Sequence, residues 1–295
     1  HSRRGQVRGK RLIMAKIGVQ MMMVKEAVAE QGMWPVLQKL KALDIDAVEV
    51  SQIPMTTENR DALHRAIGEL GIEVGALSVA LAHKEGATID SLDTHFDKIV
   101  DDCQRLNTRF VRIGMMPFEA MVSKQATEAW AAEVNPYAVK LKVHGITLCY
   151  HNHHADLIKF DGERIFDIVR RVAPDVQFEV DLHWVQRGGM APLDMLEEYS
   201  GACKLIHVKD YRVDALPQDA IDLFNAGKFA EGYDKFVNII QFAEVGQGNM
   251  NWPKILPAAI KAGAEFFFIE QDMTYGRDPF ACVKDSREYL KSIGY

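Results

Sequence analysis

The chain alternates short β-rich runs with amphipathic helical stretches, and this pattern constrains the fold more than any other feature. The eight β-rich runs span residues 17–22, 47–51, 74–80, 110–115, 146–151, 176–181, 205–209 and 266–270. Strict alternation predicts a parallel sheet, because each helix carries the chain back to start the next strand in the same direction. Eight such units, with no GxGxxG motif after the first run, favour a closed (β/α)8 barrel over an open doubly wound sheet.

The length of the chain agrees with one barrel. A (β/α)8 barrel takes about 250 residues, and this chain has 295. Residues 1–13 are basic and lack an apolar stretch, so we expect an expression-derived, disordered tail there and a single barrel domain over residues 14–295. Extra residues between 210 and 248 predict an extended insertion after the seventh strand, which we interpret as a lid, an oligomer contact or a surface excursion.

Ionisable residues gather at the ends of the last four expected strands, although the strands of a barrel should be apolar. They recur at every second position, as His151 and His153, as Glu179, Asp181 and His183, as His207 and Lys209, and as Glu270 and Asp272. Side chains two positions apart point to the same face of a strand. If that face is the barrel interior, the sets converge at the C-terminal mouth, where active sites of this fold lie.

A divalent metal ion accounts for this convergence. Carboxylates and imidazoles packed together away from water are costly unless a cation offsets their charge. We predict that the ligands are Asp181, His207, Glu270 and either His151 or His153. Two carboxylates with neutral imidazoles and no thiolate suit Mn²⁺, Zn²⁺, Co²⁺ or Fe²⁺, and they leave coordination positions open for water or substrate.

Each predicted ligand, taken alone, also has an ordinary structural explanation. His207 could be a hydrogen-bonded core histidine, and Asp181 could cap the loop that follows it. Glu270 could pair with Lys209 or Arg277. Four such residues at four consecutive strand ends argue against independent coincidence, so the sequence favours the metal site.

Other residues near these strand ends are candidates for orienting the ligands or contacting the substrate. Polar groups behind metal ligands commonly hold them in place by hydrogen bonds, and an aromatic ring can wall a pocket. A cationic side chain can hold an anion. The candidates are His153, Glu179, His183, Trp184, Lys209 and Arg277.

Composition excludes several classes of function. The net charge is −6 and no basic block occurs after residue 12, which disfavours a nucleic-acid partner. No apolar run reaches the roughly 20 residues that span a bilayer, so no membrane partner is expected. The four cysteines are scattered, which predicts a reducing, cytoplasmic setting rather than a disulfide framework. There is no GxSxG, P-loop or CxxC motif.

Five segments resemble the xylose isomerase-like TIM barrel family, which is often described as sugar phosphate isomerases/epimerases and is related to endonuclease IV. They are YHNHHADL, FEVDLHWVQRGG, LIHVKD, EVGQGNMNW and FIEQD, in an order and spacing that cover about residues 14–295. The resemblance implies metal ligands at His151, Asp181, His207 and Glu270. It also implies Mn²⁺ as the main candidate, with Zn²⁺, Co²⁺ or Mg²⁺ as alternatives, and a small polyol or keto-sugar substrate in carbohydrate metabolism. Substrate contacts are implied near His183 and Lys209, and such barrels commonly form homo-oligomers.

One position departs from the epimerases of that family. They carry glutamate at the end of the fifth strand, where this chain has His151, and they use this glutamate with the one at the eighth strand to exchange protons with the substrate. The His-Asn-His variant resembles the branch of inosose dehydratase-type proteins and keto-glycoside lyases. The reaction is therefore left open between two classes.

The first hypothesis is a sugar isomerase or epimerase, in which a proton is abstracted beside a carbonyl polarised by the metal. Glu270 would be the base, and His151, His153 or Lys209 would manage the return proton. The alternative is an inosose-type dehydratase or keto-glycoside lyase at the same metal site, with His153 or His183 as the acid. An endonuclease IV-like repair enzyme and a non-catalytic barrel are further alternatives.

Overall fold

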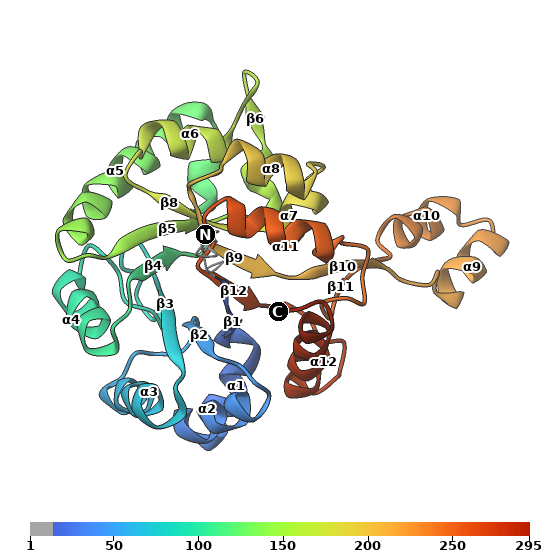
Figure 1. Cartoon of the computed structure of the whole chain (residues 1–295). Helices are drawn as coiled ribbons and strands as arrows, with labels where there is room; N and C mark the ends of the chain where they lie inside the picture. Colours follow the sequence, from blue (N-terminus) through green and yellow to red (C-terminus); the bar gives the residue numbers. More distant parts are fainter. Residues whose placement is uncertain (1–13) are drawn as a thin grey trace, which may run out of the picture.

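Eight parallel strands close into a barrel in this computed structural model, which describes residues 14–295 (Figure 1). The strands are β1 (Lys16–Gln20), β2 (Ala47–Val50), β3 (Glu73–Val79), β4 (Phe110–Ile113), β5 (Thr147–His151), β8 (Gln177–Asp181), β9 (Cys203–Val208) and β12 (Phe266–Ile269). β1 pairs in parallel with both β2 and β12, which closes the ring. The predicted (β/α)8 barrel is confirmed, and each of the eight predicted runs overlaps one barrel strand.

Helices surround the barrel because each has one apolar face to bury against the strands. The α-helices outside the insertion are α1 (Lys25–Gln31), α2 (Met33–Ala42), α3 (Thr57–Leu70), α4 (Phe96–Leu106), α5 (Lys124–Val143), α6 (Ile165–Val172), α7 (Leu182–Arg187), α8 (Pro192–Glu198), α11 (Trp252–Lys261) and α12 (Pro279–Ser292). Three short 3-10 helices, η1 (Met21–Val24), η2 (Phe118–Met121) and η3 (His154–Leu157), follow β1, β4 and β5. No helix within residues 14–295 is long and apolar enough to cross a membrane.

Apolar side chains fill the lower part of the barrel interior. Phe110, Phe266 and Phe268 form one buried cluster there with small residues of the neighbouring strands. Gly75 leaves room for these rings, since a Cβ at this position would lie 2.8 Å from Cζ of Phe268. Continuing the same alternation along β12 brings Glu270 to the interior at the C-terminal mouth. Because these apolar side chains fill the lower interior, the polar residues lie in a layer above them, at the C-terminal mouth.

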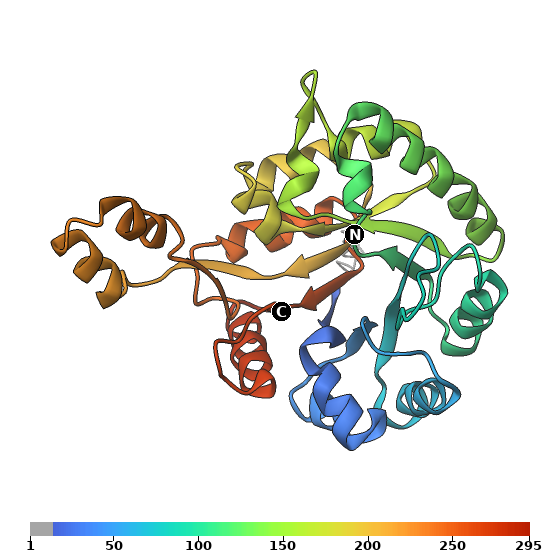
Figure 2. The ribbon, with the colours of Figure 1, turned by 180° about the vertical axis from the view of Figure 1, so that it is seen from behind.

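The insertion after β9 forms an arm. It consists of β10 (Asp210–Val213), α9 (Gln218–Asn225), α10 (Phe229–Val237) and β11 (Ile240–Ala243), with β10 and β11 paired as an antiparallel ribbon. Views from opposite sides show α9 and α10 projecting away from the barrel (Figures 1 and 2). A second small hairpin, β6 (Lys159–Phe160) and β7 (Glu163–Arg164), follows β5. The expected tail, residues 1–13, lies outside the described residues.

Candidate metal centre

Four buried residues from four neighbouring barrel strands meet at the C-terminal mouth. They are His151 at the end of β5, Asp181 at the end of β8, His207 in β9 and Glu270 directly after β12. Each offers one ligand atom, and these atoms all lie within 4.8 Å of one another. Oδ2 of Asp181 is 3.1 Å from Nε2 of His151 and 3.5 Å from Nδ1 of His207. The structure thus brings together the same four residues that the family resemblance implied as ligands.

His151 is held in an orientation that suits metal binding. Nδ1 of His151 lies 2.9 Å from the backbone carbonyl oxygen of Gly114, to which it can only donate. This leaves the lone pair of Nε2 facing Asp181. Burial, followed by the charge of His207, lowers the pKa of His151, so its imidazole is neutral near pH 7. A neutral imidazole whose second nitrogen is hydrogen-bonded is the usual form of a histidine ligand.

Unpartnered buried atoms show that these residues fit a cation. Nδ1 of His207 and Oε2 of Glu270 are 2.7 Å apart, yet within residues 14–295 neither has a hydrogen-bond partner. Although burial alone would lower the pKa of His207, the carboxylates of Glu179, Glu270 and Glu49 raise it well above its usual value. The cluster therefore attracts positive charge. Metal ions compete with protons for such atoms, so a divalent ion would satisfy both Nδ1 of His207 and Oε2 of Glu270.

A second layer of charged groups lies behind His207. Its Nε2 is 2.7 Å from Oε1 of Glu49 and 3.0 Å from Oε1 of Glu179. Nε of Arg112 is 3.6 Å from both of these carboxylate oxygens. Burial and the neighbouring Glu49 raise the pKa of Glu179 to about 8. Because Arg112 already supplies a counter-charge, we interpret this layer as support for His207 rather than as a second metal site.

Lys209 joins the ligand carboxylates at the edge of the centre. Its buried Nζ is 2.9 Å from Oδ2 of Asp181 and 3.1 Å from Oε1 of Glu270. It also donates to Oδ1 of Asp272 at 2.7 Å. Burial alone would lower the pKa of Lys209, but these three carboxylates raise it, so the ammonium form is favoured. A bound cation would compete with this ammonium group for Asp181 and Glu270.

A cavity of about 660 Å³ opens above the centre. His151 and Glu270 reach its floor, together with His153 and Asp272. Burial, then the neighbouring His151, lowers the pKa of His153 to about 3, which keeps its ring neutral near pH 7. Nδ1 of His153 has no hydrogen-bond partner among the described residues, so it is free to contact a ligand.

His183 and Trp184, two predicted contact residues at the start of α7, are not among the residues that line the cavity. Nδ1 of His183 lies 2.7 Å from the carbonyl oxygen of Asp210, and its ring stacks on Phe242 with centroids 4.8 Å apart. The backbone N–H of Trp184 donates to Oδ1 of Asp181 at 3.1 Å. The start of α7 therefore holds Asp181 in place. Nε2 of His183 and Nε1 of Trp184 have no hydrogen-bond partner among the described residues, so the substrate contacts expected through these two residues stay predictions.

Two other predicted substrate contacts are also placed away from the cavity. Arg277 binds Glu244 at 2.7 Å and Asp285 at 3.0 Å. Neither Arg277 nor Glu179 lines the cavity. Arg277 neutralises the buried Glu244, because an unpaired carboxylate there would be costly, and its contact with a substrate anion stays a prediction. Glu179 instead contacts Nε2 of His207 through Oε1.

Three further residues lie at or next to the centre: the sequence offers Asp272 by its spacing from Glu270 and Glu49 as a structural hydrogen-bonder or a substrate contact, but it does not offer Arg112. Asp272 and Arg112 line the cavity, and Glu49 contacts His207. Asp272 had a signal, since it shares the alternation of Glu270. For Glu49 and Arg112 the same alternation in β2 and β4 points to the interior, but only the closure of the barrel brings them beneath His207.

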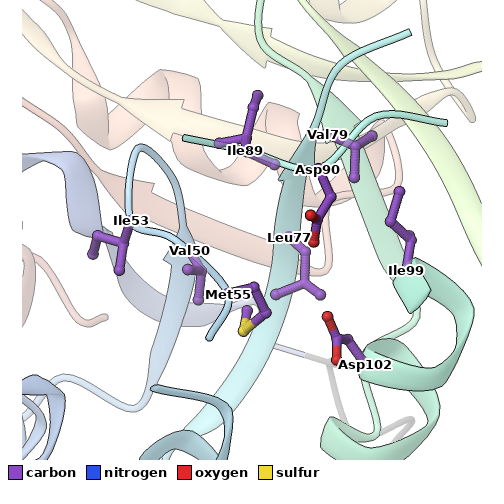
Figure 3. A pocket seen from close by; sticks show the side chains of 10 residues that line it. Val50, Ile53, Met55, Leu77, Val79, Ile89, Asp90, Ile99 and Asp102 are labelled. Atoms are coloured by element: carbon purple, nitrogen blue, oxygen red, sulfur yellow. The ribbon is translucent and has the colours of Figure 1, made fainter. Parts of the chain in front are cut away.

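A second, much smaller cavity of about 20 Å³ lies between β2, β3 and α4 (Figure 3). Its two carboxylates, Asp90 and Asp102, lie 2.7 and 2.8 Å from Nζ of Lys98. This volume holds about one water molecule. Because both carboxylates are already paired, the cavity is a packing gap rather than a second site.

A family model described as "Xylose isomerase-like TIM barrel" matches residues 37–293. The chain belongs to this family. The match covers the six barrel strands from β2 to β9, the β12 strand and all four candidate ligands. No curated protein sequence matches the chain.

Solved structures share the fold at low sequence identity. A sugar phosphate isomerase/epimerase from Parabacteroides distasonis is 18% identical with a TM-score of 0.71, covering 94% of this chain and 98% of that one. The probable 3-DHS dehydratase AsbF from Bacillus anthracis is 12% identical with a TM-score of 0.65, covering 94% and 99%. An IolI protein with a bound zinc atom is 14% identical with a TM-score of 0.60, covering 94% and 97%. At these identities the similarity establishes the shared fold.

Proposed function

We propose that the protein is a divalent-metal-dependent sugar isomerase or epimerase acting on a small keto-sugar or polyol. The observation that carries the proposal is the convergence of His151, Asp181, His207 and Glu270 beside an open cavity that His151 and Glu270 line. Membership of the xylose isomerase-like family supports it, as do structural neighbours that include an isomerase/epimerase.

Mn²⁺ is the proposed ion, with Zn²⁺, Co²⁺ and Mg²⁺ as alternatives. The donor set has two carboxylates and two imidazoles, a mixture that Mn²⁺ accepts as readily as Zn²⁺. The four cysteines are free and buried, and none belongs to the ligand group. When bound, such an ion supplies a Lewis acid that withdraws electron density from a carbonyl oxygen.

Glu270, Lys209 and His153 have separate roles in the proposed reaction. Burial alone would raise the pKa of Glu270, but Lys209 and His207 lower it well below its usual value, so its carboxylate is ionised. In this proposal Glu270 accepts the proton from the carbon beside the carbonyl. The ammonium group of Lys209 stabilises negative charge that develops on the substrate oxygen. His153, which lines the cavity, transfers the proton that returns to the substrate carbon.

His151 is best assigned as a ligand alone. Its Nδ1 is engaged with the carbonyl of Gly114 and its Nε2 faces Asp181, so neither nitrogen is free to carry a proton to the substrate. In this proposal His151 therefore has no part in proton transfer, in contrast to the catalytic role that the sequence predicts for it. This chain has His151 where the family's epimerases carry a second glutamate, so we also propose an alternative reaction.

The alternative is a dehydratase or keto-glycoside lyase that begins with the same proton abstraction. A structural neighbour described as a probable dehydratase favours keeping it. The enzyme would then expel a hydroxyl or glycosidic oxygen from the next carbon. The proton would come from the ammonium group of Lys209 in place of His153 or His183, because burial lowers the pKa of both rings and keeps them neutral near pH 7. Elimination of this kind needs only one carboxylate base, which agrees with Glu270 standing without a partner glutamate.

Isotope exchange separates the two reactions. Mn²⁺-loaded protein would be incubated in D₂O with a panel of ketoses and keto-inositols, and the products analysed by NMR and mass spectrometry. Deuterium in an unchanged carbon skeleton supports the isomerase or epimerase. A product lacking one water supports the alternative. The Asp181→Asn variant should lose both metal and activity; unchanged metal stoichiometry in this variant would contradict the proposed centre.

We further propose a cytoplasmic protein with small-molecule rather than nucleic-acid or membrane partners. The net charge of −6 and the four free cysteines support this setting. The arm exposes Phe229, Tyr233 and Phe236, which makes it the candidate contact if the protein is a homo-oligomer. Residues 214–239 of the arm do not line the cavity, so the arm is not proposed as a lid. Sedimentation of the purified protein would decide its oligomeric state.

A further inference from the structure

The cavity above the metal centre has two walls of different chemistry. The ligands His151 and Glu270, with Asp272 and His153, form a polar wall. The ends of β1, β3 and β4 and the segments after them supply further lining residues, which include a group of large apolar side chains as well as Gln20, Lys84 and Glu119. This apolar group, which we call the apolar wall, consists of Met22, Leu81, Met115 and Phe118. A ligand that fills the cavity would therefore meet polar groups beside the metal centre and the side chains of the apolar wall.

The apolar wall is continuous with the metal centre. The carbonyl of Gly114 accepts from Nδ1 of His151 at 2.9 Å, and Met115 is the next residue. Phe118 then starts η2 at the rim, where 70% of it is exposed, and 43% of Met115 is exposed. Large apolar side chains left in water beside a polar pocket mark a surface that a ligand covers.

Phosphate-binding groups are scarce in this cavity. Among the described residues that line it, the only side chains with a permanent positive charge are Lys84 and Arg112. Arg112 donates to Ser51 at 2.7 Å and faces Glu49 and Glu179, so it is already engaged. Lys84 stands exposed at the rim. A phosphorylated substrate would find no cluster of cationic side chains among the described residues that line the cavity.

We infer that the substrate is a sugar carrying an aryl substituent, with the sugar at the metal centre and the aryl ring against Met22, Leu81, Met115 and Phe118. This inference rests on the proposed function and narrows its substrate class to aryl glycosides or similar aryl-substituted sugars. The cavity volume of about 660 Å³ lies among pockets that bury a drug-sized ligand. Thioether and phenyl side chains make favourable contacts with aromatic rings, whereas a free small sugar would leave this wall in water.

The test compares phenyl β-D-glucopyranoside with methyl β-D-glucopyranoside on the Mn²⁺-loaded protein, by calorimetry and by paramagnetic broadening of the ligand NMR signals. We expect the phenyl glycoside to bind at least about tenfold more tightly, as burial of an aromatic ring predicts. Its sugar protons should broaden more than its ring protons, because the ring lies farther from the ion. Glucose 6-phosphate should bind no better than the methyl glycoside.

Variants separate the apolar wall from the rest of the protein. Phe118→Ala combined with Met115→Ala should remove most of the phenyl preference while leaving the metal stoichiometry unchanged. Phe236→Ala, an exposed phenylalanine on the arm, is the matched control and should retain the preference. Equal affinity for the two glycosides, no binding of either, tighter binding of glucose 6-phosphate, or an unchanged preference in the double variant would overturn the inference.

The same preparation distinguishes this failure from failure of the proposed function. If the protein binds the ion and exchanges deuterium into an unsubstituted ketose but shows no aryl preference, only the substrate class is refuted. If it neither binds the ion at His151, Asp181, His207 and Glu270 nor exchanges deuterium with any sugar, the proposed function fails and the inference fails with it.

Discussion

His207 shows how one imidazole can serve a metal site and the core together. Its Nδ1 faces Glu270 at 2.7 Å, and its Nε2 faces Glu49 at the same distance. The carboxylate behind the ring holds the N–H on Nε2 and leaves Nδ1 for the ion. Such an arrangement raises the basicity of the ligand and keeps the ring from rotating.

Replacing Glu49 by glutamine should therefore weaken metal binding from a distance. Glu49→Gln keeps the shape of the side chain but removes the charge that holds His207, and we expect affinity for Mn²⁺ to fall about 10–100-fold. Competition with a chromophoric chelator measures the dissociation constant. Glu231→Gln on the arm is the matched control. An affinity equal to that of the wild type in Glu49→Gln would show that this carboxylate does not support the ligand.

Asp156 is a buried carboxyl whose protonation should make stability depend on pH. It accepts from the hydroxyl of Tyr150 at 2.5 Å and from the backbone N–H of His153 at 2.7 Å. Burial raises its pKa to about 7, against about 3.9 in an unfolded chain. Between these values the folded protein keeps a proton that the unfolded chain has released, so the free energy of unfolding falls as pH rises from about 4 to about 7.

The variant Asp156→Asn should lack this part of the pH dependence. Denaturant unfolding at pH 4.5 and pH 7.5 would compare it with the wild type and with Asp194→Asn, an exposed control. We expect the loss of stability toward neutral pH to be smaller in Asp156→Asn than in either of the others. Parallel pH profiles for all three proteins would contradict the assignment.

Each barrel strand divides into an apolar lower part and a polar end. In β12, Phe266 and Phe268 fill the interior, and Glu270 follows at the same parity. The rings need space from the facing strands, which Gly75 in β3 provides. A Cβ at Gly75 would lie 2.8 Å from Phe268 and 3.1 Å from Phe266, closer than normal packing allows.

Gly75→Ala should therefore destabilise the barrel by overpacking, at a cost of about 1–3 kcal/mol. Gly68→Ala is the matched control, because Gly68 lies in α3 and a Cβ there would meet nothing within 4 Å. This second change should be neutral or stabilising by about 0.5–1 kcal/mol, since alanine favours the helix. Equal effects of the two substitutions, measured by urea unfolding, would refute the packing argument.

At the scale of the whole molecule, the metal ion should link separate strands of the barrel. The four ligands come from the ends of β5, β8 and β9 and from the residue after β12. An ion bound only by the folded protein stabilises it by about 2.7 kcal/mol when its concentration is 100 times the dissociation constant. For a domain of this size each kcal/mol raises the melting temperature by roughly 2–4 °C.

We therefore expect saturating Mn²⁺ to raise the melting temperature of the metal-free protein by about 5–10 °C. Differential scanning calorimetry before and after treatment with a chelator measures the shift. Asp181→Asn should show little or no rise. A melting temperature that does not respond to any of Mn²⁺, Zn²⁺, Co²⁺ or Mg²⁺ would be incompatible with a metal ion joining these strands.

The alternation of β-rich runs and helical stretches was sufficient to predict the barrel, and the alternation of side chains within strands was sufficient to predict the interior face. These are local properties, because the backbone geometry of a strand places every second side chain on one side. Asp181, His207 and Glu270 could be selected on these grounds, and the family resemblance singled out His151 from His153. The position of Asp272 followed from the same rule, although its contact with Lys209 did not.

Only the tertiary structure determined which groups contact the predicted ligands, and which predicted site residues do not line the cavity. Glu49 meets His207 across 158 residues of sequence, a contact that exists because β2 and β9 face the same closed interior. Arg277 forms an ion pair with Glu244, and Nδ1 of His183 forms a hydrogen bond with the carbonyl of Asp210. Buried charges and polar groups need such partners, because leaving them unpaired is costly. Such pairings depend on the three-dimensional path of the chain, so spacing along the sequence does not reveal them.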